Sequence, residues 1–330
     1  MGVTEKTKSK RGGLLQRATD RIVTLVLVAS MTIGIALLVY PSFADYWNSF
    51  HQSRAVMSYA KDISNLDTHV YDEISESAKL YNEKLGERGI SWILTEEEKK
   101  AYNAELNIGG TGIMGYIRIQ KLGVTLPIYH GTDDSILQTS IGHLEASSLP
   151  VGGSGTHCML SGHRGLPSAR LFTDLDKMKE GDQFTLNVLN ETLTYEVDHI
   201  WIVEPADLSQ LTIEPGKDYC TLITCTPYGI NTHRLLVRGH RVENVNGNAM
   251  IVAEALQIRP IFIAPIVAVP IVILLLLWIL VDTSAKRKKN RNIKKDYLAE
   301  RGLTAEDIEP EERRAIIDAV REFMEKGRDR

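Results

Sequence analysis

The chain has 330 residues, of which 43% are apolar and 24% are charged, and its formal net charge is −4. This composition excludes a disordered chain, a collagen and a small scaffold held together by disulfides. The near-neutral charge gives no reason to expect nucleic acid as a partner. The length predicts about two domains and allows a sizeable core.

Two uncharged apolar segments, residues 22–40 and 261–281, predict two transmembrane helices, because about 20 apolar residues are needed to cross the hydrocarbon core. Lysine and arginine are concentrated in residues 1–21 and 282–295, and they are sparse on the other flank of each segment. By the positive-inside rule, both termini are cytoplasmic and residues 41–260 lie outside. We therefore expect a cell-membrane protein whose central part is extracellular.

Each apolar segment has an alternative interpretation. The first could be a cleaved signal peptide, since Ser42-Phe43-Ala44 resembles a small-residue cleavage site. Its apolar run exceeds the roughly 7–15 residues usual in a signal peptide, which favours a retained anchor. The second could be a buried core helix, but its length and the cationic run behind it favour a membrane helix.

The exterior part begins with a helical pattern over residues 45–88, where apolar side chains recur at spacings of three and four. Gly86 and Gly89 end this pattern. Thr95 and Glu98 have the spacing of a capping box, which predicts a short acidic helix starting after Thr95.

From Met114 onward, short runs rich in β-branched residues alternate with turn residues, and two of these runs are residues 193–197 and 199–203. Such a pattern favours a barrel or a sandwich over a parallel α/β sheet. The predicted parts are a cytoplasmic N-terminus (1–21), a transmembrane helix (22–40), an exterior helical segment with a lid-like region (41–112), a β-barrel domain (113–245), a linker (246–260), a second transmembrane helix (261–281) and a basic cytoplasmic tail with a helix (282–330).

Cys225, His163 and Arg234 form a candidate catalytic set. Cys225 ends a strand-like run, and Arg234 lies on the next run after a turn, so a hairpin can bring the two together. A nearby cation favours the thiolate, and an arginine supplies N–H donors for an oxyanion. His163 lies in a turn after residues 158–160. A thiol, an imidazole and a guanidinium supply the nucleophile, the proton shuttle and the charge stabiliser of acyl transfer.

Spacing alone leaves other interpretations open, including an accidental Cys–His pair. A serine site at Ser154 is disfavoured because its surroundings lack the last glycine of G-x-S-x-G. Cys220 is five residues before Cys225 and therefore faces the opposite side of a strand, so we expect it, like Cys158, to be a small buried hydrophobe. A metal site would draw on residues without the tight Cys-x2-Cys spacing, namely Cys158, His163, Cys220, Cys225 and His233.

Three ordered blocks of the sequence resemble the sortases. Residues 221–239, TLITCTPYGINTHRLLVRG, resemble the active-site strand of class C, the pilus-assembling branch. Residues 160–176, with LSGHRGLPSA and LFTDLD, agree, as do GYIRI at 115–119 and LPIYHG at 126–131. The resemblance covers roughly residues 50–282 and includes the C-terminal membrane anchor typical of that class.

The resemblance implies a mainly β fold, a closed sortase-type β-barrel with short helices, beside the N-terminal helical segment and two flanking transmembrane helices. It implies that Cys225 is the nucleophile, His163 the acid/base and Arg234 the donor to the substrate or oxyanion. Cys225 would cleave an LPxTG-like sorting signal between Thr and Gly, and a pilin lysine would resolve the thioester into an isopeptide bond, with hydrolysis as the side reaction. Neither a cofactor nor a metal is implied.

Two other functions stay open: attachment of surface proteins to peptidoglycan amines, and a non-catalytic membrane scaffold that uses the barrel for binding.

The sequence also departs from the family at the lid. Class C enzymes usually carry an Asp-Pro-aromatic motif before the acidic helix, whereas residues 90–96 read ISWILTE. Trp92, Ile93 and Leu94 are therefore candidates for an apolar lid without its carboxylate. The alternative is that Trp92 packs under the N-terminal helices.

Overall fold

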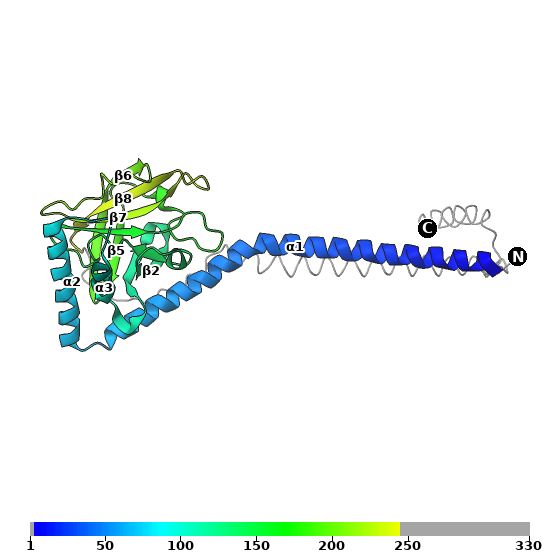
Figure 1. Ribbon diagram of the computed structural model, residues 1–330, viewed down its shortest axis with the longest axis horizontal. Coiled ribbons are helices and arrows are strands. Elements are labelled where there is room, and N and C mark those ends of the chain that lie inside the picture. The colour runs from blue at the N-terminus through cyan, green and yellow to red at the C-terminus, as the bar shows by residue number, and fades with distance from the viewer. Residues whose placement is uncertain (1–2, 245–330) are drawn as a thin grey trace, which may run out of the picture. The chain divides into compact units, whose positions relative to one another are not determined.

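The computed structural model describes residues 3–244 (Figure 1), so the predicted linker, second transmembrane helix and cytoplasmic tail lie outside the described residues. The helices are α1 (Val3–Ser64), α2 (Thr68–Arg88), α3 (Glu96–Ala104) and α4 (Asp134–Leu137). The strands are β1 (Ile113–Ile119), β2 (Val124–His130), β3 (Ile141–His143), β4 (Thr156–Ser161), β5 (Gln183–Val188), β6 (Glu191–Val203), β7 (Asp218–Thr226) and β8 (His233–Val242).

The predicted first transmembrane segment forms part of α1, which continues through Pro41. From residue 26 the helix is long and apolar enough to cross a membrane. Its apolar side chains are exposed, Leu37 by 69% and Leu38 by 81%, as expected of a helix whose surroundings are lipid. A signal sequence has the same length and composition, so retention of the segment stays a prediction.

The expectation of one helix over residues 45–88 is wrong at residues 65–67, where α1 ends and α2 begins. The side chain of Asp67 accepts a hydrogen bond from the backbone N–H of His69 at 2.9 Å and so caps α2. An N-cap needs an extended backbone, and Asp67 has φ −65° and ψ 144°. The apolar periodicity therefore continues across a break in the helix.

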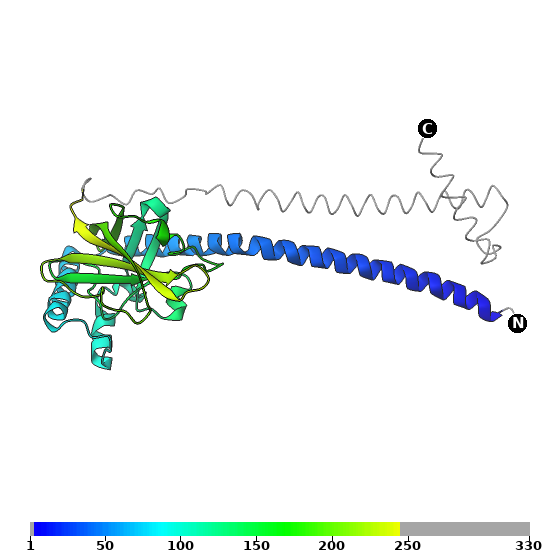
Figure 2. The ribbon, with the colours of Figure 1, turned by 90° about the horizontal axis from the view of Figure 1, so that it is seen from above.

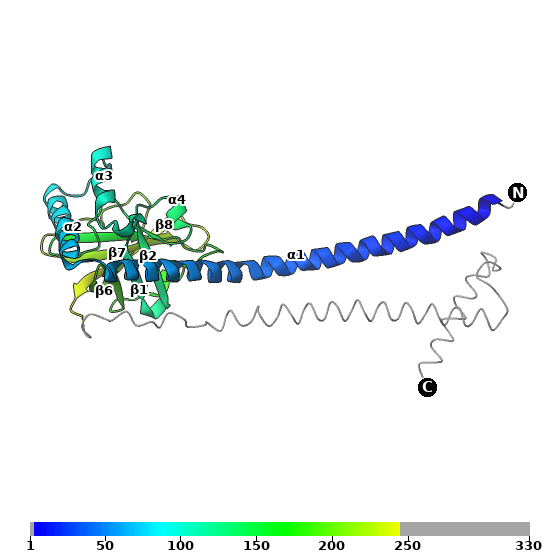
Figure 3. The ribbon, with the colours of Figure 1, turned by 90° about the horizontal axis from the view of Figure 1, so that it is seen from below.

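The predicted capping box of α3 is confirmed: the Thr95 hydroxyl accepts from the Glu98 N–H, and a Glu98 carboxylate oxygen accepts from the Thr95 N–H. Tyr102 of α3 is fully buried, and its hydroxyl contacts His143 Nδ1 at 2.9 Å and accepts from the Gly131 N–H at 3.0 Å. These bonds fasten α3 to the barrel directly after the candidate lid. Figures 2 and 3 show α2 and α3 flanking the same side of the barrel.

The predicted barrel is confirmed as a closed sheet with the strand order β1-β2-β3-β4-β7-β8-β6-β5. The prediction of separate strands at residues 193–197 and 199–203 is wrong, because β6 runs unbroken for 13 residues. An irregularity between Val197 and His199 in the pairing with β8 accounts for the interrupted pattern, since a bulge shifts the alternation by one residue. The short strand β3 gave no signal in the sequence.

Two apolar clusters lie on opposite faces of the same barrel wall. Cys220, Leu222 and Val237 belong to the interior core. The outer cluster is Met159, Leu211, Ile223 and Leu236, which lie on the outside of β4, β7 and β8 and on the connection before β7. The residues that precede β7 thus give this wall a second, outer apolar layer.

Candidate active site

Cys225 and Arg234 lie directly opposite each other in the antiparallel pairing of β7 with β8. Opposed residues share a face of the sheet. That face is the outer one, because Ile223 and Leu236, two residues away along each strand, belong to the outer apolar cluster. Cys225 is partly exposed, unlike the other cysteines. The hairpin therefore makes Cys225 and Arg234 cross-strand neighbours on the outer face, and the Arg234 guanidinium donates to the backbone carbonyls of Asn231 at 3.4 Å and His233 at 3.2 Å.

His163 is brought to the level of Cys225 by the parallel pairing of β4 with β7. That pairing ends with Ser161 opposite Ile223. It is extended by two hydrogen bonds: the Gly162 N–H donates to the Ile223 carbonyl at 3.1 Å, and the Thr224 hydroxyl donates to the Gly162 carbonyl at 2.7 Å. His163 directly follows Gly162, and Cys225 directly follows Thr224.

The turn that carries His163 is fastened again on its far side. Arg164 Nη1 donates to the Thr226 hydroxyl at 3.0 Å, and its Nη2 donates to Asp176 at 2.5 Å. The Arg164 side chain is only 8% exposed. Hydrogen bonds from residues on both sides of His163 therefore reach residues on both sides of Cys225.

Gly162 and Gly165 allow this close approach. A Cβ on Gly162 would lie 2.8 Å from the ring of Phe172 and 2.9 Å from Ile141, closer than packed atoms come. Gly165 has φ +79°, a conformation that favours glycine, and a Cβ there would lie 3.0 Å from Tyr228. Gly162 is therefore required by the close packing of Phe172 and Ile141, and Gly165 by its backbone conformation.

A cavity of about 210 Å³ opens beside Arg234 on the outer face. Its lining mixes apolar and polar side chains from β4, β6, β7, β8, the connection between β6 and β7, and the residues after β2 and β3. The lining residues are Thr132, Leu144, Ser161, Val203, Pro205, Asp207, Leu208, Leu211, Ile223, Arg234 and Leu236. A hollow with both apolar side chains and a guanidinium in its lining is suited to a peptide that has apolar side chains and a polar backbone.

The lid candidates Trp92, Ile93 and Leu94 line a second hollow of about 420 Å³, which shares Thr132 and Leu144 with the first. Trp92 is 40% exposed and Ile93 is 87% exposed. The segment thus lies next to the cavity, with Ile93 largely exposed and Trp92 and Leu94 partly buried. That it covers Cys225 stays a prediction.

The other sequence candidates lie elsewhere. Cys158 and Cys220 are buried partners in the pairing of β4 with β7, and burial raises the pKa of the Cys220 thiol. His233, opposite Thr226, contacts the neighbouring Thr232 hydroxyl through Nδ1 at 2.9 Å. Among residues 3–244, no three His, Cys, Asp or Glu side chains converge as metal ligands would.

Sequence reasoning missed Arg164 and the cavity wall formed by residues 205–211. Arg164 adjoins His163 in the S-G-H-R-G run, yet its reach to Thr226 depends on pairing between segments 62 residues apart. Leu208 and Leu211 are apolar residues in a connection without a strand-like or helical apolar pattern. Apolar side chains at such places are the signal that could have indicated a wall.

A family model described as a sortase domain matches residues 117–242. The chain is 29% identical over 181 residues to Sortase D of Bacillus subtilis (strain 168), covering 54% of this chain and 87% of that protein. Sortase C1 from Streptococcus agalactiae is 57% identical with a TM-score of 0.57, and the match covers 58% of this chain and 99% of that one.

Two further solved structures agree with these matches. Sortase C of Streptococcus pneumoniae is 42% identical with a TM-score of 0.53, covering 58% of this chain and 97% of that chain. Sortase C of Clostridium perfringens, solved with its C-terminal cell wall sorting motif, is 41% identical with a TM-score of 0.52, covering 58% and 100%. Most of these relatives are class C enzymes. Because the chain shares their sequence and has a closed barrel, it belongs to the sortase family of cysteine transpeptidases.

Proposed function

We propose that this sortase polymerises pilins, with Cys225 as nucleophile, His163 as acid/base and Arg234 as the donor to the oxyanion. The observation that carries the assignment is the pairing of Cys225 with Arg234 at the level that His163 reaches through Gly162 and Thr224. This pairing supports the assignment because acyl transfer needs a nucleophile, a proton shuttle and an N–H donor close together.

In the first half-reaction, the Cys225 sulfur attacks the threonine carbonyl carbon of an LPxTG-like sorting signal. The carbonyl oxygen gains negative charge and accepts hydrogen bonds from Arg234. The C–N bond to glycine then breaks, and protonated His163 gives its proton to the leaving amine. The product is a thioester between Cys225 and the threonine, and the cleaved tail departs with a free amino group.

In the second half-reaction, the neutral amine of a pilin lysine attacks the thioester carbonyl. His163 accepts the proton that the amine loses, the C–S bond breaks, and an isopeptide bond forms. Cys225 returns as the thiolate, so atoms and protons balance over the cycle. Water attacking in place of the amine gives hydrolysis as the side reaction.

The cavity beside Arg234, which is lined in part by apolar side chains, supports an extended sorting peptide as the donor. The Clostridium perfringens relative was solved with a sorting motif, and the Streptococcus pneumoniae relative is described in terms of pilin substrate specificity. These class C relatives favour a pilin lysine over a peptidoglycan amine as acceptor. The anchor in α1 would hold the barrel outside the membrane, where pilins and surface proteins arrive.

Mass spectrometry of the full chain with a sorting peptide tests the assignment. We expect an acyl adduct on Cys225 in the wild type, none in Cys225→Ala, and at least a hundredfold slower formation in His163→Ala and Arg234→Ala, in line with the loss of an acid/base or an oxyanion donor. Cys220→Ala and Cys158→Ala are the matched controls, and both should still form the adduct. An adduct in Cys225→Ala that disappears in Cys220→Ala would reverse the assignment.

The acceptor is tested by competition after the adduct has formed. A pilin domain with its lysine and a peptidoglycan-derived amine are supplied at equal concentration, and the products are weighed. Transfer to the lysine supports pilin polymerisation. Transfer to the cell-wall amine alone would assign this sortase to surface-protein anchoring.

A further inference from the structure

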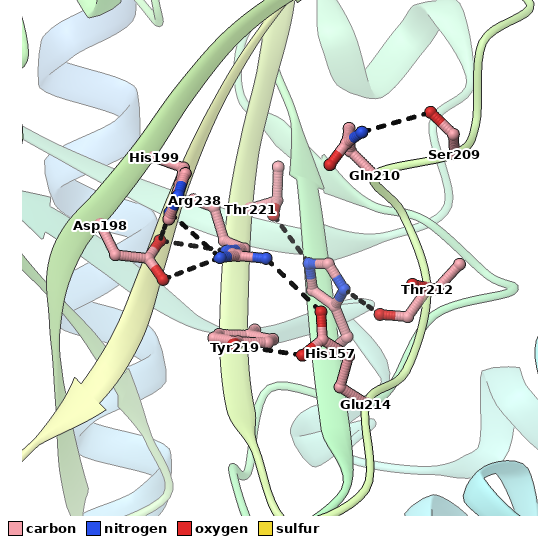
Figure 4. Close-up of polar contacts among 10 residues, drawn as sticks. All are labelled: His157, Asp198, His199, Ser209, Gln210, Thr212, Glu214, Tyr219, Thr221 and Arg238. Atoms are coloured by element: carbon pink, nitrogen blue, oxygen red, sulfur yellow. Dashed lines mark hydrogen bonds and ion pairs between the residues drawn. The ribbon is translucent and has the colours of Figure 1, made fainter.

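The connection between β6 and β7, residues 204–217, differs in how its two halves are held. In the first half, the described hydrogen bonds are local: the Asp207 N–H donates to the Glu204 carbonyl, and the Ser209 N–H donates to the Asp207 carboxylate. The second half is fastened to the barrel by contacts of Thr212 with His157 and of Glu214 with Arg238, which Figure 4 shows. Because the first half forms a wall of the cavity beside Arg234, the place of that wall depends on the second half.

His157 holds the connection through a backbone atom. The side chain is fully buried on β4, and its Nδ1 lies 2.7 Å from the Thr212 carbonyl oxygen. A carbonyl only accepts, so Nδ1 carries the proton, and Nε2 accepts from the Thr221 hydroxyl at 2.7 Å. Figure 4 shows the ring between Thr212 and Thr221. His157 thus ties Thr212 to the wall formed by β4 and β7.

Arg238 holds the connection through charge. Its guanidinium donates to both carboxylate oxygens of Asp198 on β6, at 3.0 and 2.9 Å. Its Nη1 also lies 3.7 Å from a carboxylate oxygen of Glu214 on the connection. The guanidinium stacks over the Tyr219 ring at 4.1 Å, and the Arg238 side chain is only 11% exposed. Arg238 therefore joins a carboxylate of the barrel to a carboxylate of the connection.

Leu211 lies between the cavity and these two attachments. It is 5% exposed and belongs to the outer apolar cluster with Met159, Ile223 and Leu236. It also lines the cavity, as do Leu208 and Arg234. Residues 211–214 are thus fixed by a hydrogen bond, an apolar contact and an ion pair, and the cavity wall starts from this fixed point.

We propose that His157 and Arg238 are positioning residues that set the affinity for the sorting peptide, because together they fix residues 211–214 and thereby the cavity wall beside Arg234. The inference rests on the proposed function for the identity of the peptide. Neither residue lines the cavity, so both act through the connection. Losing the attachment should weaken peptide binding and leave the reactivity of Cys225 unchanged.

The first test compares His157→Phe with His157→Asn in the full chain in detergent. Phenylalanine keeps the ring and loses both hydrogen bonds, whereas the asparagine amide can still donate to the Thr212 carbonyl. We expect His157→Phe to raise KM for a sorting peptide about tenfold, the size of the one lost buried hydrogen bond that reaches the connection, the bond to the Thr212 carbonyl. Its kcat and the rate of Cys225 alkylation should stay within about twofold of the wild-type values. In His157→Asn, KM should lie close to the wild-type value.

The second test compares two neutralised partners of Arg238. Glu214→Gln acts on the connection and Asp198→Asn acts on the barrel, so the pair separates positioning from stability. We expect Glu214→Gln to raise KM about threefold, the size expected of a half-exposed ion pair. Asp198→Asn should lower the unfolding temperature more than Glu214→Gln does and leave KM within about twofold.

Hydrogen exchange of residues 204–217 is measured in the same proteins and does not depend on turnover. We expect faster exchange in His157→Phe and in Glu214→Gln. Exchange at the wild-type rate in both variants, or an unchanged KM despite faster exchange, would overturn the inference. If His157→Phe does not fold, Glu214→Gln decides. If the wild type turns over no sorting peptide, the proposed function fails, and the exchange rates still decide whether the two residues hold the connection.

Discussion

Thr224 and Gly162 are joined by a hydrogen bond of 2.7 Å from the buried threonine hydroxyl to the glycine carbonyl. One residue further on stand Cys225 and His163. The bond continues the parallel pairing of β4 with β7 past the end of β4, so it fixes the distance between the proposed nucleophile and the proposed acid/base.

Thr224→Val should therefore lower kcat more than it raises KM. Valine keeps the shape of threonine and leaves the Gly162 carbonyl without its partner, which costs about 1–3 kcal/mol. We expect kcat to fall by about tenfold or more, because small misplacements of a proton shuttle are costly. Steady-state kinetics with a sorting peptide measures the effect. Thr224→Ser keeps the hydroxyl and should retain most of kcat; equal losses in the two variants would contradict the role of the bond.

Acid should destabilise the wild type through His157. Burial lowers the pKa of His157 from its ordinary value of 6.5 to about 4. The unfolded chain therefore binds a proton below about pH 6.5, and the folded chain binds it only below about pH 4. The stabilisation is fully present above pH 6.5 and is lost as the pH falls from 6.5 to 4, by about 3 kcal/mol over that range.

His157→Asn removes this dependence, since asparagine does not titrate. We expect the free energy of unfolding, measured in urea at pH 7 and at pH 4.5, to fall by about 2 kcal/mol more in the wild type than in the variant. Both proteins carry the same carboxylates, so the contribution of the carboxylates to the loss of stability cancels when the two losses are subtracted. Identical losses would show that folding leaves the pKa of His157 unchanged, which would contradict the prediction.

Trp92→Ala should raise the rate of Cys225 alkylation by less than about tenfold. Trp92 is already 40% exposed, so a lid held by its burial is worth less than the roughly 1.5–3 kcal/mol of a fully buried large side chain. Ile93→Ala, at a position that is 87% exposed, is the control and should leave the rate unchanged. A thousandfold increase in the alkylation rate in Trp92→Ala would mean that the lid keeps the reagent away from Cys225 in nearly all wild-type molecules. A rate equal to that of Ile93→Ala would mean that Trp92 belongs to no lid.

Both termini should be protected from a membrane-impermeant thiol reagent on intact cells. The prediction follows from the cationic runs in residues 1–21 and 282–295. Ser9→Cys, Ser64→Cys and Thr304→Cys are compared one at a time in a Cys225→Ala background, in which Cys158 and Cys220 remain buried. We expect labelling of Ser64→Cys alone. Labelling of Thr304→Cys would place the tail outside, and a mature chain that starts near Asp45 would show that the first segment is cleaved.

Sequence patterns predicted those features that depend on neighbouring residues. The capping box at Thr95 is local chemistry, and the alternation along β7 predicted that Cys220 and Cys225 face opposite sides, as the interior core confirms. The break before α2 was missed because the cap at Asp67 interrupts the helix without interrupting its apolar spacing.

The unpredicted features depend on contacts between distant segments. The bulge after Val197 is defined only by the partner strand β8. The wall at Leu211 depends on packing against Met159, Ile223 and Leu236. The bond from His157 to Thr212 joins residues 55 positions apart. The connection carries no periodicity, so its few apolar residues do not show which strands they pack against.

Because Cys158 and Cys220 are buried, labelling the cysteines of the unaltered chain reports whether the barrel is folded. The sequence holds three cysteines, and the structure leaves only Cys225 within reach of solvent. A reagent that cannot enter the barrel should attach once per folded molecule, so fluorophores or crosslinkers can be placed at this thiol without engineering. Unfolding releases the two interior thiols, so the number of modified cysteines per chain counts the molecules that have lost the barrel.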